Sequence, residues 1–321
     1  MTQGGANLRG ALFGLAAFGI FATHDVIVKV LGGTYAPVQL LFFSVLLSFP
    51  LVTLMLLHDR ADENLRPRHP WWTALRTGAV VVTGLSAFYA FATLPLAQVY
   101  AILFASPLIV TVLSIPILGE RVRLRRWLAV IVGLAGVLVV LRPGDSALGA
   151  GHVAALAAAL GGATASVVVR RIGHLERNAV LLLYPMVANF AVMAVALPFF
   201  YRPMPASDLG LIALVAVLGF AAMLCLITAY KTGEAGVIAP MQYSQILWAT
   251  GYGIFFFGER PDPATALGAA LIIGSGLYIL VREGRAGSAH RPVSGSLQPR
   301  FEAGILPRVG VWLRFRRSRS Q

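Results

Sequence analysis

Ten apolar stretches of about twenty residues each run through most of the chain and are joined by short segments. A helix needs roughly 20 apolar residues, at a rise of about 1.5 Å each, to cross a hydrocarbon core about 30 Å thick. In lipid, a helix also satisfies its own backbone hydrogen bonds. The sequence therefore predicts an all-α integral membrane protein with ten transmembrane helices, at approximately 8–31, 37–57, 72–92, 97–117, 125–142, 148–171, 178–200, 208–230, 236–257 and 265–282.

The composition excludes a soluble globular protein. Of the 321 residues, 58% are hydrophobic and 12% are charged, and the mean hydropathy is +0.78. Ordinary globular proteins carry roughly 25% charged residues. The net charge of +13 comes from basic residues in short loops and in the C-terminal tail, not from a folded basic domain. We therefore expect a small molecule and membrane lipids as partners, and no nucleic acid.

The tripeptide Gly-Glu-Arg occurs twice, at Gly119–Arg121 and at Gly258–Arg260, and each copy ends an apolar stretch. Arginines follow the first copy, whereas Pro-Asp-Pro follows the second. Five helices per half is an odd number, so the second half enters the membrane in the opposite direction. The sequence predicts two inverted five-helix repeats, which are typical of solute transporters. We place them at 8–143 and 147–283, followed by a basic tail at 284–321 that is predicted to be disordered.

The distribution of lysine and arginine predicts the orientation. With the N-terminus inside, 22 of the 26 basic residues fall on the inner side. Because inner loops are enriched in lysine and arginine, both termini are predicted to be cytoplasmic, in the inner (plasma) membrane. The four basic residues on the outer side are Lys29, Arg142, Arg202 and Arg260.

Several short motifs resemble the EamA-type drug/metabolite transporter superfamily. They are Asp25-x3-Lys29, Leu96-Ala-Gln-Val-Tyr100 before Ser106-Pro107, and Val237-Ile-Ala-Pro240 before Tyr243. The chain is most similar to the branch that contains bacterial S-adenosylmethionine uptake carriers. Riboflavin carriers and amino-acid exporters share the fold, so the resemblance implies ten helices in two EamA repeats without identifying the cargo. Relatives often carry an arginine after the paired aromatics of helix two, where this chain has Phe42-Phe43-Ser44, and another before the tyrosine of helix nine, where it has Gln242. Because both positively charged groups are missing here, an anionic substrate is disfavoured.

Ionisable side chains inside a bilayer are costly, so each is a functional candidate. Asp25 and Lys29 lie four residues apart on one helix face. They form either a self-neutralising pair or a gate or ion-binding site, and His24 beside them is either a proton carrier or an interhelical hydrogen-bond partner. Glu120 and Glu259 end their helices where a carboxylate opposes the dipole. They are either gate residues or interfacial anchors.

Helix nine carries the candidate substrate-binding residues Gln242, Tyr243, Gln245 and Trp248. Pro240 removes a backbone donor and bends the helix at membrane depth. Aromatic walls with a few amides suit an organic solute. The alternative is interhelical packing. In the opposing half, Tyr89 and Tyr100 are the counterpart candidates.

These features together predict a secondary transporter that moves a small organic metabolite by alternating access, with ion coupling left open. No Gly-x4-Gly-Lys-Ser/Thr motif is present, so a gradient rather than ATP is expected to drive transport. We expect no cofactor, metal or catalytic residue, and the oligomeric state is not predicted. The alternatives are an intramembrane enzyme acting on a lipid-linked substrate, for which His-Glu-x-x-His and nucleophile-elbow motifs are absent, and a membrane scaffold or sensor.

Overall fold

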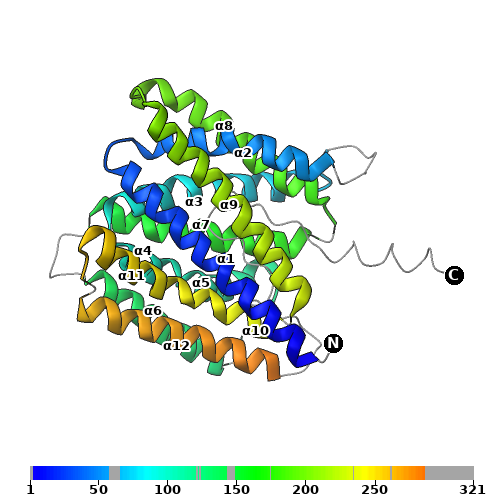
Figure 1. The fold of residues 1–321 in the computed structure, drawn as a ribbon. Helices are drawn as coiled ribbons and strands as arrows, with labels where there is room; N and C mark the ends of the chain where they lie inside the picture. The colour runs from blue at the N-terminus through cyan, green and yellow to red at the C-terminus, as the bar shows by residue number, and fades with distance from the viewer. Residues whose placement is uncertain are drawn as a thin grey trace.

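A computed structural model describes residues 3–57, 66–120, 122, 124–142, 149–173, 175–233, 235–260 and 262–285. Regular structure within these ranges is entirely helical, which confirms the predicted fold class (Figure 1). Residues 286–321, most of the predicted tail, lie outside the described part. In chain order the helices are α1 (Gln3–Gly32), α2 (Pro37–Leu57), α3 (Pro70–Thr93), α4 (Leu96–Leu103), α5 (Ser106–Leu118), α6 (Leu124–Leu141), α7 (Ala150–Ile172), α8 (Asn178–Phe200), α9 (Ala206–Thr232), α10 (Ala235–Ile238), the 3₁₀ turn η1 (Ala239–Tyr243), α11 (Ser244–Phe257) and α12 (Pro263–Arg285).

The helices account for all ten predicted spans. By length and composition, six described helical segments can cross a membrane, and the apolar parts of α2, α6 and α12 are shorter. The tenth span consists of α10, η1 and α11 in succession. After an even number of crossings the chain returns to the face from which it started, and the first residues of α1 lie at the same end as the last of α12 (Figure 1).

Spans four and nine are interrupted, whereas the sequence predicted a continuous helix for span four and a bend at Pro240 in span nine. Span four breaks between α4 and α5, and span nine passes through η1 before α11. Pro107 follows the first break and Pro240 lies within η1. Proline has no N–H and disfavours the helical conformation of the residue before it, so each interruption has a local cause.

The inverted repeat is visible in which helices pack together. The first helix of each repeat packs against the third helix of the other, as α1 with α9 and α3 with α7. The second helices pair as α2 with α8, and the fifth helices as α6 with α12. These two pairs lie at opposite edges of the bundle, with the remaining helices between them (Figure 1). The crossed pairing means that the two repeats interlock instead of forming separate domains.

The Gly-Glu part of both copies forms the same turn. Gly119 and Gly258 end their helices in the left-handed conformation, with φ of 72° and 63°. The next residue then donates its backbone N–H back into the helix, from Glu120 to Ser114 O at 3.4 Å and from Glu259 to Gly253 O at 2.9 Å. Glycine adopts this conformation without the Cβ clash of other residues. The turns place the two glutamates in equivalent positions.

Candidate functional site

A buried polar cluster lies where α1 meets α4. Asp25 exposes only 1% of its surface, and His24 and Tyr100 are also buried. The Tyr100 hydroxyl donates a hydrogen bond to Asp25 Oδ2, and His24 Nδ1 lies 2.9 Å from Asp25 Oδ1. Tyr100 and two of the predicted coupling or gating residues, His24 and Asp25, therefore form one site. Buried carboxylates need such partners, because an isolated charge in a low-dielectric interior is strongly unfavourable.

A series of aromatic contacts connects this cluster to the interruption in span nine. Tyr100 packs against Phe91 and Phe104, with ring centroids 5.5 and 6.0 Å apart. Phe104 in turn meets Tyr243 edge to face at 5.2 Å. Phe104 and Tyr243 are separated by the same number of residues as Gly119 and Gly258, so they occupy equivalent positions in the two repeats.

The predicted residues of span nine do not share one environment. Gln245 is buried and its Nε2 has no hydrogen-bond partner, so it retains an unused donor in the interior. Gln242 and Tyr243 are partly buried, and the Tyr243 hydroxyl lies so close to Gly276 of α12 that a Cβ there would clash. Trp248 is 43% exposed and lies beside Gly19 of α1.

Tyr89 lies outside the buried group. It exposes 37% of its surface on α3, whereas Tyr100 is buried. The structure therefore brings together His24, Asp25 and Tyr100, connects them through Phe104 to Tyr243, and leaves Tyr89 apart. Phe104, which makes this connection, was not singled out from the sequence, although its equivalence to Tyr243 could have identified it.

An ion pair joins the two repeats at the C-terminal end of α1. Lys29 Nζ lies 2.8 Å from Glu259 Oε1. It also donates to Leu94 O at 2.5 Å and lies 5.2 Å from the ring centre of Phe257. The other carboxylate oxygen of Glu259 accepts the backbone N–H of Leu96 at 3.0 Å. Lys29 is thus paired with the other repeat, not with Asp25 in its own helix.

The equivalent ion pair lies at the opposite face of the bundle. Arg170 at the end of α7 lies 2.5 Å from Glu120 Oε1. The next residue, Arg171, donates to Ile117 O and covers the ring of Trp72 at 4.8 Å. The sequence Lys29-Val-Leu-Gly aligns with Arg170-Arg-Ile-Gly, so both pairs join equivalent positions. We did not predict Arg170 as the partner, although this alignment contains the signal.

A second type of contact between the repeats follows the same symmetry. The Tyr35 hydroxyl, between α1 and α2, donates to Asp208 Oδ2 at 2.5 Å, in the first turn of α9. On the other face, Glu176 Oε1, between α7 and α8, accepts the backbone N–H of His69 at 2.5 Å, just before α3. The hydrogen bond to Asp208 is the main reason that the pKa of Tyr35 is raised above 10.0, and desolvation and the negative charge of Asp208 add to it.

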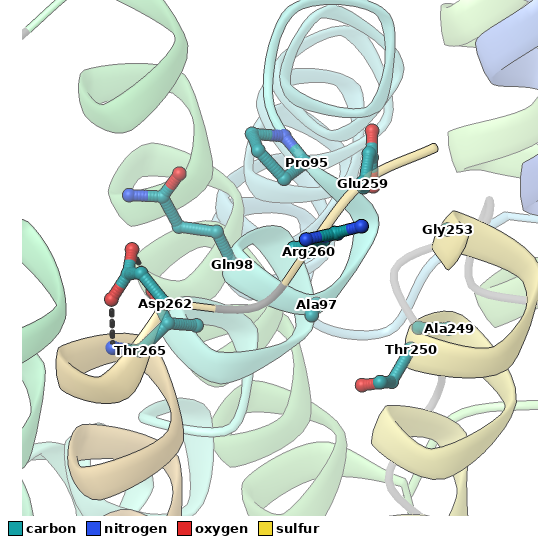
Figure 2. A pocket seen from close by; sticks show the side chains of 10 residues that line it. All are labelled: Pro95, Ala97, Gln98, Ala249, Thr250, Gly253, Glu259, Arg260, Asp262 and Thr265. Atoms are coloured by element: carbon teal, nitrogen blue, oxygen red, sulfur yellow. Dashed lines mark hydrogen bonds between the residues drawn. The ribbon is translucent and has the colours of Figure 1, made fainter. Parts of the chain in front are cut away.

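A small pocket of about 30 Å³ opens beside Glu259. Figure 2 shows the side chains around it, with Glu259 and Arg260 on the segment that follows α11. Asp262 accepts hydrogen bonds from Thr265 at the start of α12 and is paired with Arg142. Desolvation acts to raise the pKa of Asp262, but the Thr265 hydrogen bonds and the Arg142 charge outweigh it, so this pKa is lowered. The pocket is lined by Pro95, Ala97, Gln98, Ala249, Thr250, Gly253, Glu259, Arg260, Asp262 and Thr265.

Ten membrane spans in two inverted repeats, with interrupted helices that meet at a buried polar cluster, define a multi-pass membrane transporter. The EamA-like transporter family matches residues 8–142 and 149–281. The chain belongs to this family. This membership confirms the predicted resemblance and the prediction of a transporter instead of an enzyme.

Known relatives carry different small molecules. The chain is 25% identical over 284 residues to an S-adenosylmethionine uptake transporter of Rickettsia prowazekii, covering 88% of this chain and 96% of the relative. It is 28% identical to a riboflavin transporter of Rhizobium johnstonii, over 69% of this chain and 74% of the relative. It is 27% identical to a pseudopaline exporter of Pseudomonas aeruginosa, over 82% of this chain and 93% of the relative.

The fold also matches a solved structure. A crystal structure with 21% sequence identity covers 89% of this chain and 100% of its own chain, with a TM-score of 0.58. At this identity the match shows the shared fold alone.

Proposed function

We propose that the protein is a secondary carrier that moves a small organic metabolite across the inner (plasma) membrane by alternating access. Both termini are cytoplasmic in this proposal, because 22 of the 26 lysines and arginines then lie on the inner side. The transported metabolite and the surrounding lipids are its partners.

One observation carries this proposal: the equivalent residues Phe104 and Tyr243 contact each other at the two helix interruptions, next to Asp25 and Tyr100. In carriers built from inverted repeats, interrupted helices form a substrate site near the bilayer midplane, at the interface of the repeats. A site in that place is equally distant from both membrane faces. Rocking of the repeats then exposes it to one face or the other.

The substrate site of this proposal is formed by the buried groups around the Phe104–Tyr243 contact. Asp25 and Tyr100 offer polar contacts, and the aromatic rings offer a surface for a flat or positively charged group. Gln245 Nε2 is a donor that a bound solute would satisfy. Gln242 and Trp248 line the approach along span nine, and Tyr89, which is exposed, is the weakest member of the set.

Ion coupling, where it occurs, is assigned to the Asp25–His24 pair. The two side chains are buried and lie within hydrogen-bond distance of each other. Histidine is a side chain that can accept and release a proton, and here it lies beside a carboxylate. The pair therefore provides a group whose charge changes with proton binding inside the transport path.

The test is transport by the purified full-length protein in proteoliposomes. Radiolabelled S-adenosylmethionine, riboflavin and amino acids are measured in counterflow, after a thermal-shift screen with the same compounds, because a bound ligand stabilises the native state. We expect one compound both to raise the unfolding temperature and to exchange across the bilayer. Turnover of a lipid-linked substrate without solute flux would instead support an enzyme, and binding without flux would support a sensor.

A further inference from the structure

We propose that the Lys29–Glu259 and Arg170–Glu120 ion pairs are the latches of two gates, one on each side of the membrane, that open in alternation. The inference rests on the proposed carrier function and adds its mechanical control. It also gives Arg170 a role in the transport cycle. We call the two faces of the bundle the Lys29 side and the Arg170 side, after the ion pair at each face.

The two latches close opposite ends of the same central site. Lys29 lies in the last turn of the first span and Arg170 in the last turn of the sixth span. The two basic residues therefore lie on opposite faces of the bundle. Asp25 lies one helical turn from Lys29, inside the bundle. Separation of one pair therefore opens the interior toward one face and leaves the other face closed.

The contacts between the repeats fall into two groups with different roles. Tyr35–Asp208 fastens the α1–α2 connection to α9, which already packs along α1, and His69–Glu176 does the same for α3 and the end of α7. These contacts lie within the tightly packed pairs α1–α9 and α3–α7. We infer that they persist while the protein changes conformation.

The latches instead connect these tightly packed pairs to the interrupted spans. Lys29 connects α1 to the turn after α11, and Glu259 also holds the first residue of α4 through Leu96 N–H. Arg170 connects α7 to the turn after α5. Spans four and nine have broken helices next to the central site, so they are the elements that can move with a local change in backbone angles.

Ion pairs at this depth suit reversible gates. The side chains are 12% and 18% exposed in the Lys29 pair and 18% and 18% in the Arg170 pair. When a gate opens, water enters and hydrates both charges, so a pair that is strong when closed separates at small cost. The two pairs are similarly buried, so opening either gate exposes a comparable pair of charges. The pocket of about 30 Å³ beside Glu259 is large enough to hold a water molecule next to this latch (Figure 2).

The test measures which side of the membrane reaches the interior, and it needs no substrate. Ala105, buried at the break of span four, is replaced by cysteine in a Cys225→Ser background. A membrane-impermeant maleimide is applied to the full-length protein from either face. The variants are Lys29→Gln and Glu259→Gln for one latch, and Arg170→Gln and Glu120→Gln for the other. Glutamine removes the charge at each position and keeps a polar side chain, and at Glu259 and Glu120 it also keeps the length.

We expect opposite effects from the two latches. Loss of the Lys29 latch should raise labelling from the Lys29 side about fivefold and lower labelling from the Arg170 side, and loss of the Arg170 latch should give the mirror result. The exchanged pairs Lys29→Glu with Glu259→Lys, and Arg170→Glu with Glu120→Arg, rebuild the ion pairs and should move the rates part of the way back to the original values. Restoration is incomplete on the Lys29 side, because the exchange loses the hydrogen bonds to Leu94 O and from Leu96 N–H. Tyr35→Phe is the matched control, because it removes a contact within α1–α9 and should leave both labelling rates unchanged.

Three outcomes would overturn the proposal. They are unchanged labelling in the glutamine variants, a change in the same direction for both latches, and labelling rates in the folded exchanged pairs that stay at those of the glutamine variants, with folding checked by thermal unfolding. Because labelling requires no cargo, a mirror result without transport of any solute would refute the carrier function and keep the gates. Transport at the wild-type rate in all the latch variants would refute the gates and keep the carrier function.

Discussion

The rings of Phe104 and Tyr243 contact each other edge to face at 5.2 Å, and the two residues occupy equivalent positions in the two repeats. Residues related by a twofold axis touch only where they lie close to that axis. The contact therefore marks the axis that relates the repeats. It passes through the interruptions of spans four and nine, beside the polar cluster around Asp25.

The first prediction concerns this axial contact. Phe104→Ala and Tyr243→Ala each remove one ring from the axis, and we expect transport per inserted protein to fall about tenfold or more. Tyr243→Phe keeps the ring and should retain most of the activity. Counterflow in proteoliposomes measures the effect, with membrane insertion checked by detergent extraction and thermal unfolding. Normal transport in both alanine variants would remove the axis from the substrate path.

The second prediction concerns coupling at Asp25. Asp25→Asn removes the titratable charge but keeps an oxygen that can accept the Tyr100 hydrogen bond. We expect the variant to lose accumulation against a gradient and to retain counterflow, because exchange needs no driving ion. Proton-driven uptake and counterflow are compared in the same vesicles. Accumulation at the wild-type level would eliminate Asp25 as the coupling residue.

Hydropathy and internal similarity predicted the architecture of ten spans in two repeats from the sequence. The bilayer requires a fixed length of apolar helix, so ten stretches of that length predict ten spans. The two Gly-Glu-Arg copies indicated the repeat. The first residue of each copy, Gly119 or Gly258, indeed adopts the same left-handed conformation. The apolar length of a helix and a repeated tripeptide are local features, so they can be recognised in one sequence.

The site was harder to predict because a membrane helix is apolar on its lipid face and on its packed face. Gln245 and Trp248 were both predicted to bind substrate, yet Gln245 is buried and Trp248 is 43% exposed. Ion-pair partners were also missed. Lys29 has Asp25 one turn away in its own helix but pairs with Glu259, more than two hundred residues later. Such contacts follow from how the repeats interlock, which local spacing does not encode.

The third prediction tests the left-handed turn after α5. Gly119 has φ of 72° and no neighbouring atom where a Cβ would lie, so Gly119→Ala adds backbone strain alone. We expect a loss of about 1 kcal/mol in the free energy of unfolding, and a smaller loss for Gly119→Asn. Gly251→Ala, inside α11 with equally open space, is the control and should be neutral or stabilising. Equal stability of the two alanine variants in detergent would contradict the assignment.

The fourth prediction concerns pH and the Tyr35–Asp208 hydrogen bond. Because the pKa of Tyr35 is raised in the folded protein, the stability from this contact is fully present below pH 10. It is lost as the pH rises through the folded-state value, where the phenolate forms beside the carboxylate. Tyr35→Phe should therefore unfold at a lower temperature than wild type at pH 8, and the difference should shrink above pH 10. A difference that stays constant between pH 8 and pH 11 would show that this hydrogen bond does not stabilise the fold.

The fifth prediction tests the contact between the two fifth helices. A Cβ on Gly136 of α6 would lie 2.8 Å from the carbonyl oxygen of Gly268 in α12, and a Cβ on Gly268 would lie 2.6 Å from the carbonyl oxygen of Gly136. Backbone cannot rotate away as a side chain does, so Gly136→Ala forces the helices apart. We expect a loss of about 1–3 kcal/mol in the free energy of unfolding.

Gly274→Ala, on α12 with no atom within 4 Å of the added Cβ, is the matched control for this contact. It gains helix propensity without a clash, so its unfolding temperature should equal or exceed that of wild type. Thermal unfolding of both variants in the same detergent separates close packing from propensity. If Gly136→Ala were as stable as Gly274→Ala, α6 and α12 would have to lie farther apart in the membrane than their glycine contact requires.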